Sequence, residues 1–489
     1  MSENLLSSLN ESQKIAAQHI DGPLLILAGA GSGKTKTITT RLAYLISIGI
    51  DPRSILTLTF TNKAASEMRE RAFNMLDSSQ INTPPLLCTF HKFGLLFLKF
   101  HMNELGRKNN FIIIDTDDKK RILKSFDKEI TTSLLVSEIS KYKNSLLTPA
   151  EAKAAAQLKL YQEIADIYEQ YEAYLEKNNL VDFDDLLLLP YKILKNNEKL
   201  AEETSKKYQY IMVDEYQDTN ELQYRLLRLL CSSHNNLCVV GDDDQSIYGW
   251  RGATIKNILN FSEHFENTLV VKLEENYRST DTILNHANQL IEHNRDRLGK
   301  KLIGTRTKGD SIRVYESQDE NDETRKIVED IKKMVEAGTN PKDIAILFRV
   351  NALSRALEEG FNKAGLNYKL VGGMKFYERS EIKDLIAYFR ILTNSNDNFS
   401  IKRIINKPKR GIGKTTIDKL EAKSIESGKS IFDLIQQLDS EEIGSIVGKK
   451  NSRTLKVFEA SILDLKELKK KKKMKFLDAF EETFDYRAS

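Results

Sequence analysis

Residues 24–45, LLILAGAGSGKTKTITTRLAYL, decide the fold class of this chain. An apolar run (LLILA) is followed by a glycine-rich turn (GAGSG) and then by an amphipathic stretch (KTKTITTRLAYL), which predicts a strand, a loop and a helix. This order is the first half of a β-α-β unit, the building block of a parallel sheet.

Further short apolar runs extend this pattern. We expect strands at 55–59, 210–213, 237–240 and 269–271, with a helix from about Asn62. Strands that alternate with helices indicate an α/β fold with a parallel sheet. Residues 89–207 instead have 3.6-residue periodicity and predict a helical insertion. A second alternating set, with strands expected at 312–315, 344–348 and 368–371, predicts a second α/β domain, and residues from about 375 onward are helical and basic, with a lysine run at 469–473.

The glycine-rich turn carries the first chemical signal. Residues 28–35, AGAGSGKT, place backbone N–H groups around phosphate oxygens at the positive end of a helix. The nucleotide residues we predict here are Ala28, Gly29, Ala30, Gly31, Ser32, Gly33, Lys34, Thr35 and Lys36. Lys34 would reach the outer phosphates and the Thr35 hydroxyl would bind Mg²⁺. The strict motif begins with glycine, so Ala28 is a departure from it.

Two carboxylates follow the strand expected at 210–213. Asp214 and Glu215 would lie at the carboxyl end of a parallel strand, where ligands bind in such sheets. Asp214 would hold Mg²⁺, and Glu215 would orient and deprotonate the attacking water. Alone, such a pair is more often a solvated strand end; beside a phosphate-binding loop, the catalytic interpretation is favoured.

Composition limits the remaining classes. The 489 residues suffice for about three domains, and 74 basic against 70 acidic side chains give a net charge of +4, so nucleic-acid binding would depend on local patches. Three cysteines without a CxxC pair indicate neither a disulfide framework nor a zinc site. No apolar run approaches the ~18 residues that cross a bilayer, so we expect a cytoplasmic protein without membrane contact.

Five motifs together resemble the superfamily 1A DNA helicases, most closely the UvrD/Rep/PcrA group. They are AGAGSGKT (28–35), TFTNKAA (59–65), VDEYQDTN (213–220), GDDDQSIYGWR (241–251) and ENYRST (275–280), and similar text continues at DRLGKKL (296–302). The resemblance implies two RecA-like parallel-sheet domains, the second one incomplete, each with a helical insertion. On this basis the domains are 1A (1–88 and 208–278), 1B (89–207), 2A (279–374) and 2B (375–489).

The resemblance also implies roles in nucleotide chemistry. Gln13 matches an adenine-reading glutamine, Tyr277 an aromatic that stacks on adenine, and Arg278 an arginine directed at the γ-phosphate. Gln245 matches the residue that senses this phosphate and couples it to DNA. The catalytic set is therefore Lys34, Glu215, Gln245 and Arg278, with ATP and Mg²⁺ as cofactors. Lys36 stands where many relatives have arginine.

On the DNA side, Phe60, Tyr248 and Trp250 match positions that stack on unpaired bases. Further DNA contacts are implied for Asn62, His91, Arg251, Gly411 and Gly413. Several alternatives stay open: a lone Trp is most often a core residue, a lone His is often structural, and the GIG turn at 411–413 could be a plain helix turn rather than a duplex-phosphate contact. The lysine run is more readily explained as a solvated helix face.

Two later motifs of the family do not follow Ala479, which indicates truncation within the second helical subdomain. The resemblance implies an ATP-dependent DNA helicase and translocase, a hydrolase and isomerase that moves 3′ to 5′ on single strands in DNA repair or replication restart. Its partners would be single-stranded DNA, junctions of single and double strands, and repair proteins. The alternative is an ATP-switched, single-stranded-DNA-binding fragment that does not unwind productively.

Overall fold

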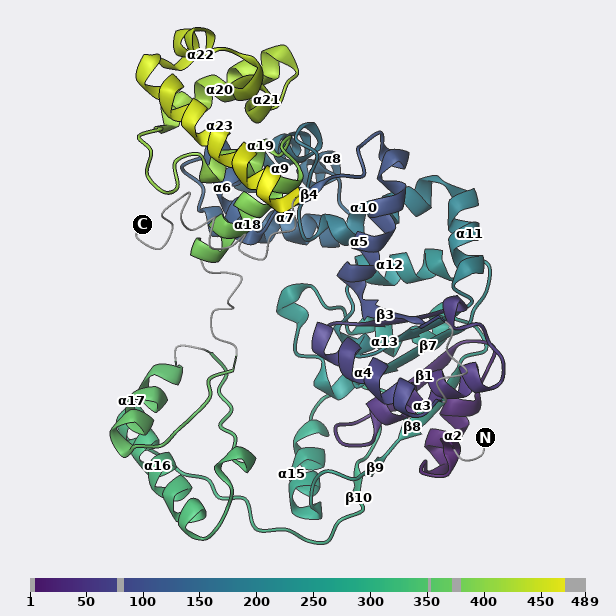
Figure 1. Ribbon diagram of the computed structural model, residues 1–489. Helices are drawn as coiled ribbons and strands as arrows, with labels where there is room; N and C mark the ends of the chain where they lie inside the picture. Colours follow the sequence, from purple (N-terminus) through teal and green to yellow (C-terminus); the bar gives the residue numbers. More distant parts are fainter. Residues whose placement is uncertain (1–4, 77–82, 351–352, 372–379, 471–489) are drawn as a thin grey trace. The chain divides into compact units, whose positions relative to one another are not determined.

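The computed structural model describes residues 5–76, 83–350, 353–371 and 380–470. The chain forms two compact units, 1–312 and 313–489. The fold class is α/β, as predicted, and the first unit contains the sheet and most of the predicted site (Figure 1).

Six parallel strands form the central sheet in the order β3-β2-β6-β7-β1-β8. The strands are β1 (Leu24–Ala28), β2 (Ile55–Thr59), β3 (Leu86–Thr89), β6 (Tyr210–Val213), β7 (Leu237–Gly241) and β8 (Leu269–Leu273). Five of them were predicted. The sixth, β3, was not predicted; it is a four-residue strand that pairs with β2 at the edge of the sheet.

Both faces of the sheet are buried. On β1, Leu25 and Leu27 belong to one hydrophobic cluster, whereas Leu24, Ile26 and Ala28 belong to another. The second cluster includes side chains of α3 (Lys34–Ser47) and α4 (Asn62–Asn74). Strands covered on both faces appear in sequence as continuous apolar runs, which is why these strands could be predicted from the sequence.

Helices also cover the first face. They include α5 (Phe90–His101), α10 (Asp185–Asn196), α11 (Glu198–Lys207), α12 (Glu221–Leu230), α13 (Lys256–Leu259) and α14 (Phe261–His264). The remaining N-terminal helix is α2 (Glu11–Gln18), whose Asn10 and Gln13 form a reciprocal cap.

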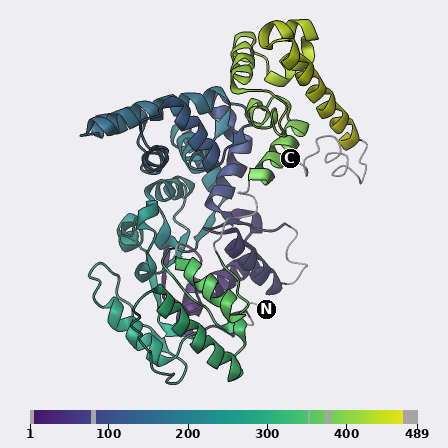
Figure 2. The ribbon, with the colours of Figure 1, turned by 90° about the vertical axis from the view of Figure 1, so that its left-hand side faces the viewer.

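Residues 90–207 are mainly helical and gather at one end of the sheet (Figures 1 and 2). Beyond α5, α10 and α11, the helices are α6 (Thr116–Phe126), α7 (Thr132–Asn144), α8 (Pro149–Ala155) and α9 (Lys159–Lys177). The short strands β4 (Ile112–Ile113) and β5 (Leu180–Val181) pair in parallel.

The last part of the first unit lies against the loop that follows β1. Strand β9 (Glu275–Asn276) pairs in parallel with β10 (Ile303–Gly304), and α15 (Asp281–Ile291) connects them. The backbone N–H of Tyr277 donates to Gly31 O at 3.0 Å. Residues far apart in sequence thus meet at the glycine-rich loop.

In the described residues of the second unit, the regular secondary structure is helical. Its helices are α16 (Glu320–Glu336), α17 (Ser354–Ala364), α18 (Ser380–Thr393), α19 (Asn398–Ile404), α20 (Lys414–Ser427), α21 (Ile431–Gln437), α22 (Ser440–Val447) and α23 (Lys449–Lys470). One apolar cluster joins α18 to α23. The lysine run falls at the end of α23, and its residues 471–473 lie outside the described residues.

The strands predicted at 312–315, 344–348 and 368–371 are wrong, because these segments have no regular secondary structure. Their apolar side chains are exposed: Val314 by 91%, Leu347 by 94% and Val371 by 81%. A strand requires a neighbour for its backbone N–H and C=O groups, and no described strand pairs with these three. Local sequence pattern alone cannot supply that neighbour. None of the described helices is both long enough and apolar enough to cross a membrane.

Candidate nucleotide site and nucleic-acid surface

The loop between β1 and α3 is shaped for an anion. Gly31 and Gly33 have φ values of 74° and 86°, in the left-handed region that favours glycine. Gly33 precedes α3, and no side chain caps this helix start. A helix that begins with uncapped N–H groups attracts phosphate.

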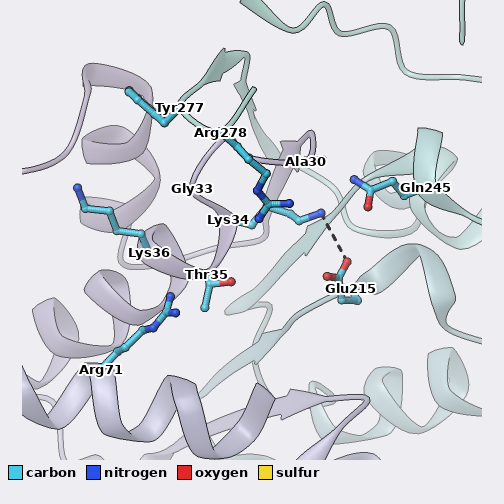
Figure 3. A pocket seen from close by; sticks show the side chains of 11 residues that line it. Ala30, Gly33, Lys34, Thr35, Lys36, Arg71, Glu215, Gln245, Tyr277 and Arg278 are labelled. Atoms are coloured by element: carbon cyan, nitrogen blue, oxygen red, sulfur yellow. Dashed lines mark ion pairs between the residues drawn. The ribbon is translucent and has the colours of Figure 1, made fainter. Parts of the chain in front are cut away.

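This loop borders a cavity of about 360 Å³ (Figure 3). The lining residues are Ala30, Gly31, Gly33, Lys34, Thr35, Lys36, Arg71, Glu215, Gln245, Tyr277 and Arg278. Among them, four carry a positive charge and only Glu215 a negative one. This excess of positive charge suits a polyanion such as a nucleoside triphosphate.

The carboxylates lie at the end of β6, as predicted. Asp214 is buried, and its Oδ1 has no hydrogen-bond partner among the described residues. Burial, together with the adjacent Glu215, raises the pKa of Asp214 to about 7. A buried carboxylate oxygen without a partner fits a divalent cation, and the Thr35 hydroxyl is the other predicted ligand.

Glu215 has an unusual backbone conformation, and its side chain faces Lys34. Its φ of 52° places a non-glycine residue in the left-handed region, a strained geometry typical of functional positions. Lys34 Nζ lies 3.6 Å from Glu215 Oε2, an ion pair marked in Figure 3. Burial raises the pKa of the neighbouring Asp218 to about 6, with Glu215 as a further cause.

Gln217 connects Glu215 to the loop after β7. Its Nε2 donates to Glu215 Oε2 at 2.9 Å, and its Oε1 accepts from Asp242 N, also at 2.9 Å. Asp242 in turn accepts a hydrogen bond from the side chain of Gln245. The predicted base and the predicted phosphate sensor are therefore joined through two intervening residues.

The predicted adenine residues separate into two groups. Tyr277 is 41% exposed and lines the cavity, and its hydroxyl donates to Glu275 and accepts from Asn10. Gln13, in contrast, is buried behind the loop, where its amide donates to Ser32 O and accepts from Asn10 N. Reading adenine would require Gln13 to break these bonds.

Three other predicted residues are near the cavity without lining it. Ala28 ends β1, Ser32 is buried, and a Cβ added to Gly29 would lie 2.4 Å from Leu302 Cδ2. Their contribution is to the shape of the loop.

Aromatic side chains form an exposed surface on the first unit. Tyr248 and Trp250 are 39% and 65% exposed, and their ring centroids are 6.4 Å apart. Trp250 is therefore not a core residue. Phe60 is half-buried against Phe90, with centroids 5.6 Å apart.

The other predicted DNA residues take different positions. Asn62 is exposed at the start of α4, and Arg251 ends the short 3-10 helix Gly249–Arg251. His91 stacks on Phe183 at 3.8 Å between centroids, and burial lowers the pKa of His91 to about 4, so the ring is neutral. In the second unit, Gly411 has a φ of 73° and Gly413 precedes α20.

Comparison with known proteins decides the family. Residues 9–266 match the UvrD/REP helicase N-terminal domain, and residues 271–486 match the UvrD-like helicase C-terminal domain. The chain belongs to the UvrD/REP helicase family. This finding confirms the resemblance drawn from the five motifs.

Relatives in this family are similar over most of the chain. The ATP-dependent DNA helicase PcrA of Staphylococcus aureus (strain Mu50 / ATCC 700699) is 43% identical over 444 residues, which cover 89% of this chain and 60% of that relative. The ATP-dependent DNA helicase PcrA of Staphylococcus epidermidis (strain ATCC 12228 / FDA PCI 1200) gives the same figures. The chain thus spans 60% of the length of these curated relatives.

Two residues that contact the predicted positions were not singled out from the sequence. Arg71, on the last turn of α4, lines the cavity, and Phe183 is a 59% exposed ring stacked on His91. An arginine on an amphipathic helix usually indicates a solvated face, and only the packing of α4 on α3 brings Arg71 to the nucleotide loop. No local signal could have found it.

Proposed function

We propose that this chain is an ATP-dependent DNA translocase and helicase. The observation that carries the proposal is the loop 242–250, which bears both Gln245 in the cationic cavity and the exposed Trp250. Binding or hydrolysis of the nucleotide would therefore change the position of an aromatic surface that can stack on bases.

ATP would bind with its phosphates along the loop at 29–35. Lys34, Arg71 and Arg278 supply positive charge where negative charge develops on the transferred phosphoryl group. Thr35 and Asp214 would hold Mg²⁺, which neutralises phosphate charge when it is bound. Tyr277 would stack on the adenine, and Gln13, once its amide is released, would read the adenine edge.

Glu215 would orient the attacking water and accept its proton. Its carboxylate is half-exposed at the cavity and is held by Gln217, so it is available to a water molecule without being free to turn away. Gln245 would contact the outer phosphate. The position of Gln245 would therefore differ between the ATP-bound and ADP-bound states, and the loop that it shares with Tyr248 and Trp250 would move with it.

Single-stranded DNA would stack on Phe60, Tyr248 and Trp250, with Asn62, His91 and Arg251 along the same path. The backbone at Gly411 and Gly413 would contact duplex phosphates at a junction. We extend the proposal, from the resemblance, to 3′–5′ movement, to a role in DNA repair or replication restart, to repair-protein partners and to a cytoplasmic location.

The test is steady-state ATP hydrolysis with and without a single-stranded oligonucleotide. We expect hydrolysis that requires Mg²⁺ and is stimulated by single-stranded DNA, and that Lys34→Ala abolishes. A chain that binds DNA but hydrolyses ATP at the same rate without it would contradict the proposal.

A further inference from the structure

Three consecutive aspartates on the loop after β7 share one buried lysine. Lys300 Nζ lies 2.6 Å from an oxygen of each of Asp242, Asp243 and Asp244. The Lys300 side chain is only 2% exposed. Three carboxylates this close together would suit a divalent cation, but here the ammonium group meets all three.

Lys300 is the main charge balance of this cluster. Burial by itself would lower the pKa of Lys300, but attraction to Asp242 and hydrogen bonds to all three aspartates raise it above its ordinary value. The other cation is Arg297, which binds Asp244 at 2.8 Å. Without Lys300, Asp242 and Asp243 would face each other as like charges in a buried place, an arrangement that buried carboxylates do not tolerate without moving or taking up a proton.

Asp242 connects the cluster to the predicted catalytic groups. One of its carboxylate oxygens binds Lys300, and the other accepts the hydrogen bond from Gln245. Its backbone N–H is held by Gln217, which also holds Glu215. The position of Asp242 therefore affects both the predicted base and the predicted phosphate sensor.

The segment that carries Lys300 also contacts the nucleotide loop. Leu302, two residues further on, packs so closely over Gly29 that a Cβ there would lie 2.4 Å from it. Leu298 N donates to Asp243 Oδ2 at 2.7 Å, and β10 leads back to β9, directly before Tyr277. One short segment, 297–304, thus contacts the phosphate-binding loop and the loop at 242–250.

We propose that Lys300 is a positioning residue that fixes the loop at 242–250, so that Gln245 and Trp250 respond together to nucleotide. This inference deepens the proposed function and rests on it for the response to nucleotide. The fixing of the loop itself depends only on the ion pairs described above. Lys300 is not among the residues that line the cavity, and its effect would pass through Asp242.

The first test is hydrogen exchange of peptides from 241–252 in the whole chain, without nucleotide. Lys300→Met should raise exchange in this segment about tenfold, because the buried aspartates lose their cation and the local structure opens more often. Lys300→Arg should keep most of the protection. The matched control Lys301→Met, at the exposed neighbouring lysine, should leave exchange unchanged.

Charge relief distinguishes positioning from general damage. Adding Asp243→Asn to Lys300→Met removes one of the uncompensated charges and should recover part of the lost protection. A merely misfolded variant would not recover. Unaltered exchange in Lys300→Met, or no recovery in the double variant, would overturn the inference.

The second test follows Trp250 fluorescence as Mg²⁺ and a fluorescently silent ATP analogue are added. The parent should respond, and Lys300→Met should lose the response while its affinity for the analogue, measured by calorimetry, stays within about threefold of the parent. A retained response in Lys300→Met would also overturn the inference. A parent that binds no nucleotide would count against the proposed function alone, since the exchange experiment decides the role of Lys300 without nucleotide.

Discussion

The Lys34 ammonium and the Glu215 carboxylate, which both line the cavity, lie 3.6 Å apart. Lys34 begins α3 and Glu215 follows β6, so two separate β-α connections at the same sheet edge supply the pair. A phosphate that binds Lys34 competes with Glu215 for this cation. Nucleotide binding would therefore separate the Glu215 carboxylate from Lys34 and leave it available to a water molecule.

Replacing Lys34 with Ala removes the cation at the start of α3. We expect ATP binding to weaken strongly and hydrolysis to be lost, since charge stabilisation at the phosphoryl group is the largest contribution in such sites. Binding of single-stranded DNA without nucleotide should survive. Lys14→Ala, on α2 and outside the cavity lining, is the control. Parental turnover in Lys34→Ala would show that the phosphates do not bind at this loop.

Glu215→Gln should separate binding from turnover. The amide keeps the shape of the side chain but cannot accept the proton of water, so hydrolysis should slow by about 10²–10⁴ while ATP affinity is retained. Asp214, with its unpartnered oxygen, should still support metal-dependent binding. Equal losses of affinity and rate would instead make Glu215 a metal ligand or a structural strand end.

Trp250→Ala should weaken binding to single-stranded DNA by about 1–3 kcal/mol, whatever the base sequence, because one stacking partner is lost. Fluorescence anisotropy of labelled oligonucleotides measures this directly. Phe100→Ala, which removes a 73% exposed ring on α5, is the matched control and should have no effect. Equal affinities of the parent and Trp250→Ala would exclude Trp250 from the DNA path.

Lys143→Met should destabilise the helical insertion. The Lys143 side chain is fully buried and pairs with Glu172, Asp182 and Asp185 within 3.1 Å. Removing one partner from a buried ionic cluster leaves uncompensated charge and costs about 3–5 kcal/mol. Denaturant unfolding of residues 90–207 measures this loss of stability. Lys141→Met, at a side chain that is 69% exposed, is the control and should leave the stability unchanged.

The His91 ring predicts a pH dependence of stability. Burial lowers the pKa of His91 to about 4 from its ordinary 6.5. Between these two pH values, His91 is therefore protonated in the unfolded chain and neutral in the folded protein. Its contribution is complete above pH 6.5 and is lost as the pH falls toward 4. Between pH 7 and pH 5 the parent should lose about 1–2 kcal/mol that His91→Phe does not lose. Identical pH profiles for the two proteins would contradict a half-buried, neutral His91.

The buried central strands could be predicted because their apolar runs are visible in the sequence and each ends in a chemically distinctive turn. The positions of the glycine-rich loop and of the 214–215 pair could be predicted for the same reason, and their roles stay predictions. Gln13 stays a prediction as an adenine-reading residue: its amide donates to Ser32 O and accepts from Asn10 N, a packing detail that no local pattern contains.

Three strands of the second set were predicted wrongly, since a β-like run becomes a strand only when another strand pairs with it. The positions of Arg71 and Lys300 were not predicted because their contacts join residues far apart in the sequence: Lys300 is 58 residues from Asp242, counting from 242 to 300. Long charged side chains usually indicate solvent exposure, and only the structure shows Lys300 to be 2% exposed.

The central claim is that the nucleotide cavity and the aromatic surface share one loop and respond as one unit. Its most direct test is the affinity of the chain for a single-stranded oligonucleotide with and without a saturating, non-hydrolysable ATP analogue and Mg²⁺. We predict that the analogue changes the dissociation constant by about 5-fold or more, and that DNA changes the affinity for the analogue by the same factor, as linkage requires. Two affinities that are each indifferent to the other ligand would contradict the account.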